Sequence, residues 1–406
     1  MNPGPEHRKT RLAVVIAHPT QYYSPWFRWL GTLKEIELKV FYLWDFGTAE
    51  HRDPRFGTTF VWDIDLLGGY EHEFVPNRAR HPGTEHFWGL YNPELSARVS
   101  AWRPSAALVF GYRYRTHLGF ILGAAGHRLP LIFRGDSHLL GQPSLSAAKR
   151  FFLSRLYARF AAITYVGAAN REYFRALGVP DSRLHFAPHA VEASRFDPHN
   201  RDDRAAAMDL RARLGIPRET VIALYAGKFH PDKRVGLLLQ AWRQLGPAGA
   251  ALVLVGDGPE RTALEAAAAA DTSVHFLPFA NQREMPSRYL MADFLVLPSG
   301  GHYETWGLSV NEAMHSGLPC LVSDRVGCQR DLVEDGVTGW VFRADDGNHL
   351  RQRLAEAVAL PPAARAALGS AARVRAAGYS YSAAAAGLLA AASGALAISG
   401  SAPLCP

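Results

Sequence analysis

The sequence predicts an α/β protein made of two doubly wound domains that face a central cleft. Short apolar runs recur along its 406 residues and are separated by stretches with helical periodicity. This alternation is typical of parallel sheets covered by helices. The chain is also long enough for two domains of ordinary size. A polar stretch at 194–204 divides the apolar runs into two sets.

Each set contains five runs that we expect to form buried strands. In the first half these runs are 12–17, 38–43, 106–110, 129–133 and 162–166. In the second half they are 221–226, 251–255, 274–277, 294–297 and 319–322. We therefore expect a first domain over 1–195, a linker over 196–205 and a second domain over 206–379.

Both ends of the chain are expected to belong to the folded protein. Arg8, Lys9 and Arg11 stand before an apolar run that is too short for a secretory signal and fits a first buried strand. The other end is alanine-rich and nearly uncharged over about the length of a membrane span. Because serines interrupt it, we expect residues of about 380–400 to form a helix that packs back on the first domain.

Composition indicates a soluble globular protein, with 48% apolar and 20% charged residues. The three cysteines, Cys320, Cys328 and Cys405, lack metal-ligand spacing and are too few for a disulfide framework. They therefore favour a reducing cytosol.

The positive charge of the chain is concentrated in its first half. Residues 1–199 carry 24 Lys and Arg against 17 Asp and Glu, whereas residues 200–406 carry 20 of each. The net charge of +7 thus belongs to the first half. It predicts either an anionic partner, such as a membrane surface or a lipid phosphate, or only a soluble basic surface. A helix with Lys149, Arg150 and Phe151 is a candidate for membrane contact, and an ordinary surface helix is the alternative.

Two glutamates eight positions apart, Glu304 and Glu312, carry the strongest functional signal. An apolar strand ends in a glycine pair before Glu304, and a helix is expected to begin near Val310 and end at Gly317. In an open α/β sheet, ligands bind at the carboxyl ends of the strands. Carboxylates placed there can accept hydrogen bonds from sugar hydroxyls.

The start of that helix offers a second feature. Backbone N–H groups around Leu308 and Ser309 can hold a phosphate. Ser309 and Glu312 also have the spacing of a capping box, in which Glu312 would only satisfy an N–H at the helix start. Both explanations of Glu312 stay open at this point, whereas Glu304 has no comparable local role.

Basic residues follow the first strand of the second half. Gly227 and Lys228 come directly after it, and Lys233 and Arg234 are expected in the first turn of the next helix. Cations there oppose the helix dipole, at about 0.3–1 kcal/mol each. A bound diphosphate explains them, because helix N–H groups and cations would converge on one anion. A solvated basic pair is the alternative.

Polar residues also follow two strands of the first half. His18 and Gln21 come after the first strand, and Arg134, Asp136 and His138 come after the fourth. These positions predict that both domains contribute to one site.

Together these residues resemble the retaining, GT-B-type glycosyltransferases of family 4. The run from Glu304 through Glu312 to Gly317 looks like that family's Glu-x7-Glu motif. Lys228, Lys233 and the GDGPE run match the family as well. The similarity is dense over about 160–345 and thin before it.

The resemblance implies two Rossmann-like domains that face a cleft. It also implies transfer of a sugar from a nucleotide sugar, with retention at the anomeric carbon and with neither a metal nor another cofactor. Lys228 and Lys233 would neutralise the diphosphate, Glu304 would bind the donor sugar and Glu312 the ribose. The remaining donor-side candidates are Gly227, Arg234, Phe279, Gly307, Leu308 and Ser309.

On the acceptor side, the resemblance implies a first-domain residue near the reaction centre, often a histidine. Arg134, Asp136 and His138 compete for that place, and His138 is favoured. His18 and Gln21 are further candidates. The expected acceptor is a saccharide or a lipid-linked molecule of polysaccharide biosynthesis, and the expected location is the cytoplasm, with the inner membrane face as an optional site.

Other functions stay open from the sequence. A nucleotide-sugar epimerase or a phosphorylase could use the same fold. A glycosidase would need two opposed carboxylates, whereas these two glutamates are expected on one side of the site. A basic protein without enzymatic activity that binds nucleic acid or membrane is a further alternative. We expect no nucleic-acid partner, because the basic residues lack the interleaved aromatics of a reading module.

Overall fold

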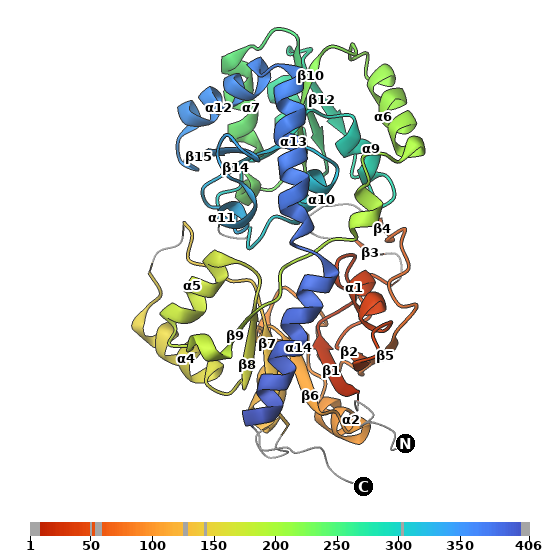
Figure 1. Ribbon diagram of the computed structural model, residues 1–406, viewed down its shortest axis with the longest axis vertical. Coiled ribbons are helices and arrows are strands. Elements are labelled where there is room, and N and C mark those ends of the chain that lie inside the picture. The colour runs from red at the N-terminus through yellow and green to blue at the C-terminus, as the bar shows by residue number, and fades with distance from the viewer. Residues whose placement is uncertain are drawn as a thin grey trace, which may run out of the picture.

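The computed structural model describes residues 9–48, 51–52, 59–124, 129–141, 144–301 and 304–398. Two parallel sheets, each covered by helices, lie at opposite ends of an elongated molecule, and the chain crosses between them near residue 190 and again after α13 (Figure 1). The predicted architecture of two doubly wound α/β domains is therefore confirmed. Cys405 and the last two residues of the expected 380–400 helix lie outside the described residues.

The N-terminal domain is built on a parallel sheet of seven strands in the order β5-β2-β1-β6-β7-β8-β9. The strands are β1 (Thr10–Ile16), β2 (Ile36–Tyr42), β5 (Glu71–Phe74), β6 (Ala106–Phe110), β7 (Leu131–Arg134), β8 (Ala162–Tyr165) and β9 (Leu184–Phe186). The helices are α1 (Tyr23–Leu30), α2 (Leu95–Trp102), α3 (Arg115–Gly123), α4 (Ala147–Tyr157) and α5 (Ala168–Ala176), and β3 (His51–Arg52) pairs with β4 (Thr59–Phe60) in a small hairpin.

The C-terminal domain is built on a parallel sheet of six strands in the order β12-β11-β10-β13-β14-β15. The strands are β10 (Val221–Ala226), β11 (Ala250–Val255), β12 (Val274–Leu277), β13 (Phe294–Leu297), β14 (Cys320–Ser323) and β15 (Gly339–Phe342). The helices are α6 (Arg201–Arg213), α7 (Val235–Leu245), α8 (Arg261–Ala268), α9 (Met285–Leu290), α10 (Leu308–His315), α11 (Gln329–Leu332), α12 (Gly347–Ala359) and α13 (Pro362–Ala377).

Both sheets reverse their strand order at a central pair of neighbours. In the first sheet this switch lies between β1 and β6, and in the second it lies between β10 and β13. Connections on either side of such a switch run to opposite faces of the sheet, which leaves a crevice at the carboxyl ends of the two strands. The loops after β1, β10 and β13 hold most of the polar residues that the sequence singles out.

The ten predicted strands all form, and the apolar runs of the inner strands are buried between helices on both faces of a sheet. The strands β5, β9 and β15 and the small hairpin were not predicted from the sequence. These three strands lie at sheet edges, where one side has no strand neighbour. β5 reads Glu-His-Glu-Phe and has no fully buried residue, so it lacks the apolar run on which the prediction depended.

The expected linker at 196–205 is partly wrong, because helix α6 begins inside it at Arg201. The side chain of Asn200 accepts hydrogen bonds from the backbone N–H groups of Asp202 and Asp203 and caps the helix. The two aspartates in the first turn also suit the helix dipole. The polar stretch is therefore a helix start as well as a connection.

Helix α14 (Tyr381–Ile398) returns from the second domain and lies against β7, β8 and β9 of the first (Figure 1). Its small residues allow this close approach: a Cβ atom on Gly387 would come within 1.8 Å of the Phe186 carbonyl oxygen. The stretch Pro362–Ala397 is long and apolar enough to cross a membrane by length and composition. In the structure, its alanine face at Ala384, Ala391 and Ala395 is buried in the core of the first domain.

Candidate active site

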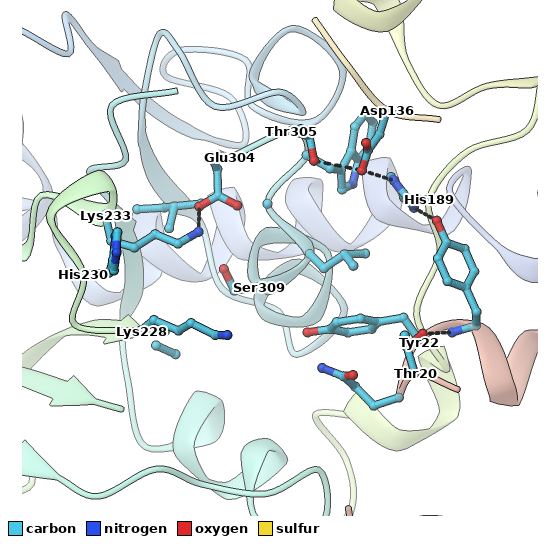
Figure 2. A pocket seen from close by; sticks show the side chains of 18 of the residues that line it. Thr20, Tyr22, Asp136, His189, Lys228, His230, Lys233, Glu304, Thr305 and Ser309 are labelled. Atoms are coloured by element: carbon cyan, nitrogen blue, oxygen red, sulfur yellow. Dashed lines mark hydrogen bonds and ion pairs between the residues drawn. The ribbon is translucent and has the colours of Figure 1, made fainter. Parts of the chain in front are cut away.

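A cavity of about 480 Å³ lies between the two domains at the switch points of both sheets. The loops after β1, β7, β10 and β13 and the crossover segment at residue 189 contribute its lining. Of the residues predicted from the sequence, the cavity is lined by His18, Gln21, Asp136, Gly227, Lys228, Lys233, Glu304, Gly307, Leu308 and Ser309. Figure 2 shows that the side chains of Lys228, Lys233, Glu304 and Ser309 gather on one side of it.

Glu304 is held firmly in the wall of the cavity. Its Oε2 atom lies 2.5 Å from the Lys233 ammonium nitrogen and also accepts a hydrogen bond of 2.8 Å from the Ser299 hydroxyl. The side chain of Glu304 is 11% exposed. An ionised pair with this little exposure has a fixed geometry, because each charge has few alternative partners.

Lys228 lies on a turn whose backbone is held in place by contacts with neighbouring residues. The Tyr225 hydroxyl donates a hydrogen bond of 2.8 Å to the Lys228 carbonyl oxygen. The glycine turn after β11 packs directly beneath, and a Cβ atom on Gly256 would lie 1.8 Å from the Gly227 carbonyl oxygen. Gly256 and Gly258 therefore support the Lys228 loop from the neighbouring strand, and Figure 2 shows the Lys228 side chain reaching into the cavity.

Helix α10 begins at Leu308, two residues earlier than predicted, and its first residues, Leu308 and Ser309, line the cavity. Its N-cap is Gly307, which has φ +102 and lies so close to Val326 and Leu297 that a side chain there would be strained. Within the described part of the chain, no side chain caps the helix through a hydrogen bond. Free N–H groups at the start of a helix favour a bound anion.

The capping-box explanation of Glu312 is wrong. Glu312 lies in the second turn of α10, and its Oε2 atom accepts a hydrogen bond of 2.6 Å from the Tyr289 hydroxyl. The side chain is buried and does not line the cavity. Burial raises the pKa of Glu312 to about 7, although Tyr289 and Tyr22 lower it in part.

Arg234 is not in a helical first turn. Lys233 ends a short 3-10 turn, η5 (Pro231–Lys233), and Arg234 follows it with φ +54 as the N-cap of α7. Its guanidinium donates to the Ala344 carbonyl oxygen at 2.7 Å and to Asp345 at 3.0 Å. It therefore lies apart from the cavity lining. Phe279 is also outside the lining and packs on Phe60, with ring centroids 4.6 Å apart.

The three residues after β7 separate into different roles. Arg134 is buried and donates to the carbonyl oxygens of Ala187 and Pro188 at 2.9 and 3.2 Å, which fixes the crossover segment. The His138 Nδ1 atom accepts from the Leu140 backbone N–H, so its Nε2–H donates to the Glu304 carbonyl oxygen at 3.1 Å. Among Arg134, Asp136 and His138, the cavity is lined by Asp136.

Several residues of the site were not singled out from the sequence. Tyr22 reaches into the cavity beside Ser309, and Thr305 and His189 flank Asp136 (Figure 2). The Ser299 hydroxyl donates a hydrogen bond to Glu304, and the Tyr289 hydroxyl donates one to Glu312. The signal for Thr305 and Tyr22 was their position next to Glu304 and Gln21, whereas Tyr289 lies in a helix that gave no functional pattern.

Two domains, each built on a parallel sheet, face each other across a cavity at the carboxyl ends of both sheets. This arrangement is the GT-B fold of glycosyltransferases. HepE of Anabaena, solved in complex with UDP and glucose, superimposes with a TM-score of 0.69 at 17% identity, over 96% of this chain and 100% of that one. Sucrose-phosphate synthase from Thermosynechococcus elongatus gives a TM-score of 0.68 at 19% identity, over 94% and 97% of the two chains.

Sequence comparison defines the family. Residues 208–375 match the family described as Glycosyl transferases group 1. Alpha-D-kanosaminyltransferase of Streptomyces kanamyceticus is 30% identical over 298 residues, which cover 68% of this chain and 75% of that protein. The chain therefore belongs to the glycosyl transferases group 1 family.

A second relative matches a shorter region. D-inositol 3-phosphate glycosyltransferase of Saccharomonospora viridis is 33% identical over 216 residues, or 50% of this chain. The match covers 48% of that protein, so the chain spans about half the length of this relative.

Proposed function

We propose that this protein is a retaining glycosyltransferase that moves a sugar from a nucleotide-sugar donor to a hydroxyl of a saccharide or lipid-linked acceptor without a metal ion. The observation that carries the proposal is the convergence of Lys228, Lys233 and the free N–H groups of α10 in one cavity beside Glu304. The names of the relatives support it, because both describe glycosyl transfer. Solved neighbours that hold UDP and UDP-glucose support a nucleotide-sugar donor.

In this proposal, catalysis comes from stabilising the charge of the leaving group. The bond from the anomeric carbon to the diphosphate oxygen breaks, the bond to the acceptor oxygen forms, and the acceptor proton leaves with the diphosphate. The ammonium groups of Lys228 and Lys233 and the N–H groups of Leu308 and Ser309 face the place where negative charge develops. Preorganised donors of this kind typically contribute about 10²–10³ in rate each.

The two glutamates then act on different parts of the donor. Glu304, which is paired with Lys233 on the cavity wall, would accept hydrogen bonds from hydroxyls of the donor sugar. Glu312 lies deeper, and among the described residues its Oε1 atom has no hydrogen-bond partner of good geometry. A buried acceptor without a partner suits the ribose hydroxyls of a nucleotide.

We expect the purified protein to bind UDP or GDP in the presence of EDTA. Binding to the folded state alone raises the free energy of unfolding by about 2.7 kcal/mol at a ligand concentration 100 times Kd, so thermal unfolding detects it. Lys233→Met should reduce the shift strongly, and Lys34→Met, at an exposed residue outside the cavity lining, should leave it unchanged. Binding that appears only after magnesium is added would contradict the metal-independent proposal.

We further propose a cytoplasmic protein that can contact the inner membrane face through α4. Phe151 and Phe152 on this helix are 64% and 47% exposed, and Lys149 and Arg150 beside them are exposed as well. Aromatic rings flanked by cations suit an anionic lipid surface.

We expect the protein to sediment with vesicles that contain phosphatidylglycerol and to stay in solution with phosphatidylcholine vesicles. Phe151→Ser combined with Phe152→Ser should abolish the difference because it removes the exposed rings. Val374→Ser, at a residue 78% exposed on α13, is the control for loss of an exposed apolar side chain. Sedimentation with neither kind of vesicle would exclude the membrane contact, and equal sedimentation with both would exclude the preference for anionic lipid.

A further inference from the structure

We propose that Asp136 positions the attacking hydroxyl of the acceptor, and that His189 and Thr305 fix the Asp136 carboxylate for this purpose. The inference rests on the proposed function and assigns the acceptor end of the same cavity. Figure 2 shows Thr305, Asp136 and His189 in one connected row on the side of the cavity away from Lys228.

One oxygen of Asp136 is held by two donors. The Thr305 hydroxyl donates to Oδ2 at 2.8 Å, and His189 Nε2 lies 3.3 Å from the same atom. The side chain of Asp136 is nevertheless 38% exposed, and it lines the cavity. Among the described residues, no other side chain donates to Oδ1 through a hydrogen bond of good geometry. The carboxylate is thus fixed on one side and open to a ligand on the other.

The bonds define the protonation of His189. An ionised carboxylate only accepts, so His189 Nε2 must carry the proton that is donated to Asp136. The Tyr23 hydroxyl lies 3.4 Å from Nδ1, which is then free to accept. Burial lowers the pKa of His189 and Arg134 lowers it further, while Asp136 acts in the opposite direction. With His189 in the neutral Nε2–H tautomer, Asp136 accepts a hydrogen bond from Nε2–H and the Tyr23 hydroxyl can donate one to Nδ1.

The same row joins three separate parts of the chain. Asp136 comes from the loop after β7, His189 from the crossover between the domains, and Thr305 from the C-terminal domain next to Glu304. The Thr305–Asp136 bond therefore links the two domains directly at the cavity.

The charge of Asp136 restricts the acceptor group. Burial by itself raises the pKa of Asp136, but the hydrogen bonds from His189 and Thr305 hold it below its ordinary value, so the carboxylate stays ionised near neutral pH. The titratable groups that face it are His189, His138 on its own loop and Tyr23 on α1. An ionised acceptor of hydrogen bonds binds a neutral hydroxyl and repels a phosphate or carboxylate at the same place.

The first test measures the release of UDP or GDP from UDP-glucose and GDP-glucose, with water as the acceptor hydroxyl. Asp136→Asn should lower the release rate at least tenfold and change nucleotide affinity less than twofold. Thr305→Val and His189→Phe should lower it three- to tenfold, and His189→Gln, whose amide can still donate, should recover most of the loss. Thr32→Val, at a surface threonine after α1, is the control for loss of a hydroxyl.

A purely structural role would not move the pH profile, and this separates the two explanations. Without the donor from Thr305 or His189, burial leaves Asp136 with a higher pKa, so the acidic limb of the rate should move to higher pH in Thr305→Val and His189→Phe. Nitrogen-15 NMR should show the neutral Nε2–H tautomer of His189 from pH 5.5 to 8, with His189→Gln for assignment. Unchanged pH profiles, or the Nδ1–H tautomer, would overturn the proposal.

The two proposals fail in different ways. If wild-type protein binds neither UDP nor GDP, the proposed function is wrong and the acceptor assignment goes with it. If the protein binds nucleotide, and wild type and Asp136→Asn release UDP or GDP from the nucleotide sugar at the same measurable rate, the proposed function stands and the acceptor assignment alone is wrong.

Discussion

Replacing Glu304 with glutamine should reduce sugar transfer by about 100- to 1,000-fold, the range found when one preorganised polar group is removed from an active site. Glutamine keeps the size of the side chain and loses its charge. The Lys233 ammonium, now 2.5 Å from the carboxylate, would lose its anchor, and the donor sugar would lose a strong acceptor for its hydroxyls.

In Glu304→Gln, nucleotide affinity should rise or stay the same, although sugar transfer falls. Removal of a negative charge beside Lys233 makes the cavity more positive, and a diphosphate is attracted more strongly. We therefore expect a dissociation constant for UDP or GDP equal to or a few times lower than that of wild type, measured by calorimetry with EDTA present. This separation of binding from transfer is specific to a residue that acts on the sugar.

The matched control is Glu356→Gln on α12, where the carboxylate pairs with Arg353 on the surface. Surface ion pairs contribute about 0–1 kcal/mol to folding and nothing to a distant site, so transfer should stay within twofold of wild type. A Glu304→Gln protein with full transfer activity would remove Glu304 from the mechanism.

The fold was predictable because its signals are local. Apolar runs such as 221–226 are buried on both faces of a sheet, and their length and spacing define parallel strands without knowledge of the partner strands. The strands β5, β9 and β15 at sheet edges were missed, and β5 shows the converse case. β5 has the composition of a loop and becomes a strand only because β2 offers free backbone groups beside it.

The site was predictable where one short segment of the chain contains both the end of a strand and the residues that would bind the ligand. Lys228 lies just after β10, and Glu304 and Ser309 lie in the loop and the helix that follow β13, the other strand of the switch point; all three line the cavity. Arg234 and Glu312 show the limit of this reasoning. The guanidinium of Arg234 turns toward Asp345, which is 111 residues away, and Glu312 is bonded by Tyr289, which lies on another helix. Sequence spacing carries no signal for such contacts.

Glu312 should make the folded protein less stable as the pH rises, and glutamine should remove the effect. Its pKa is about 7 in the folded state against an ordinary value of 4.5, because burial disfavours the ionised carboxylate. Between these two values the unfolded chain has lost the proton and the folded chain has kept it, so the free energy of unfolding falls with pH. A shift of this size corresponds to about 3 kcal/mol, lost between about pH 4.5 and pH 7.

Urea unfolding at pH 4.5, 6, 7 and 8 measures this directly. Glu312→Gln should match wild type near pH 4.5 and exceed its free energy of unfolding by up to about 3 kcal/mol at pH 8. Glu37→Gln, at a carboxylate that is 42% exposed, should follow the wild-type curve at every pH. Parallel curves for wild type and Glu312→Gln would show that the carboxylate keeps an ordinary pKa.

The same substitution should weaken nucleotide binding although it stabilises the fold. A glutamine amide offers one accepting oxygen without charge, and loss of a charge-assisted hydrogen bond to ribose costs about 1.5–3 kcal/mol, or about ten- to a hundredfold in affinity. Wild-type affinity should rise as Glu312 ionises near pH 7 and should rise less in Glu312→Gln. Ionisation of the nucleotide phosphate affects both proteins equally, so the difference between their profiles isolates the carboxylate. A buried carboxylate that destabilises the fold and strengthens nucleotide binding therefore serves ligand binding and not stability.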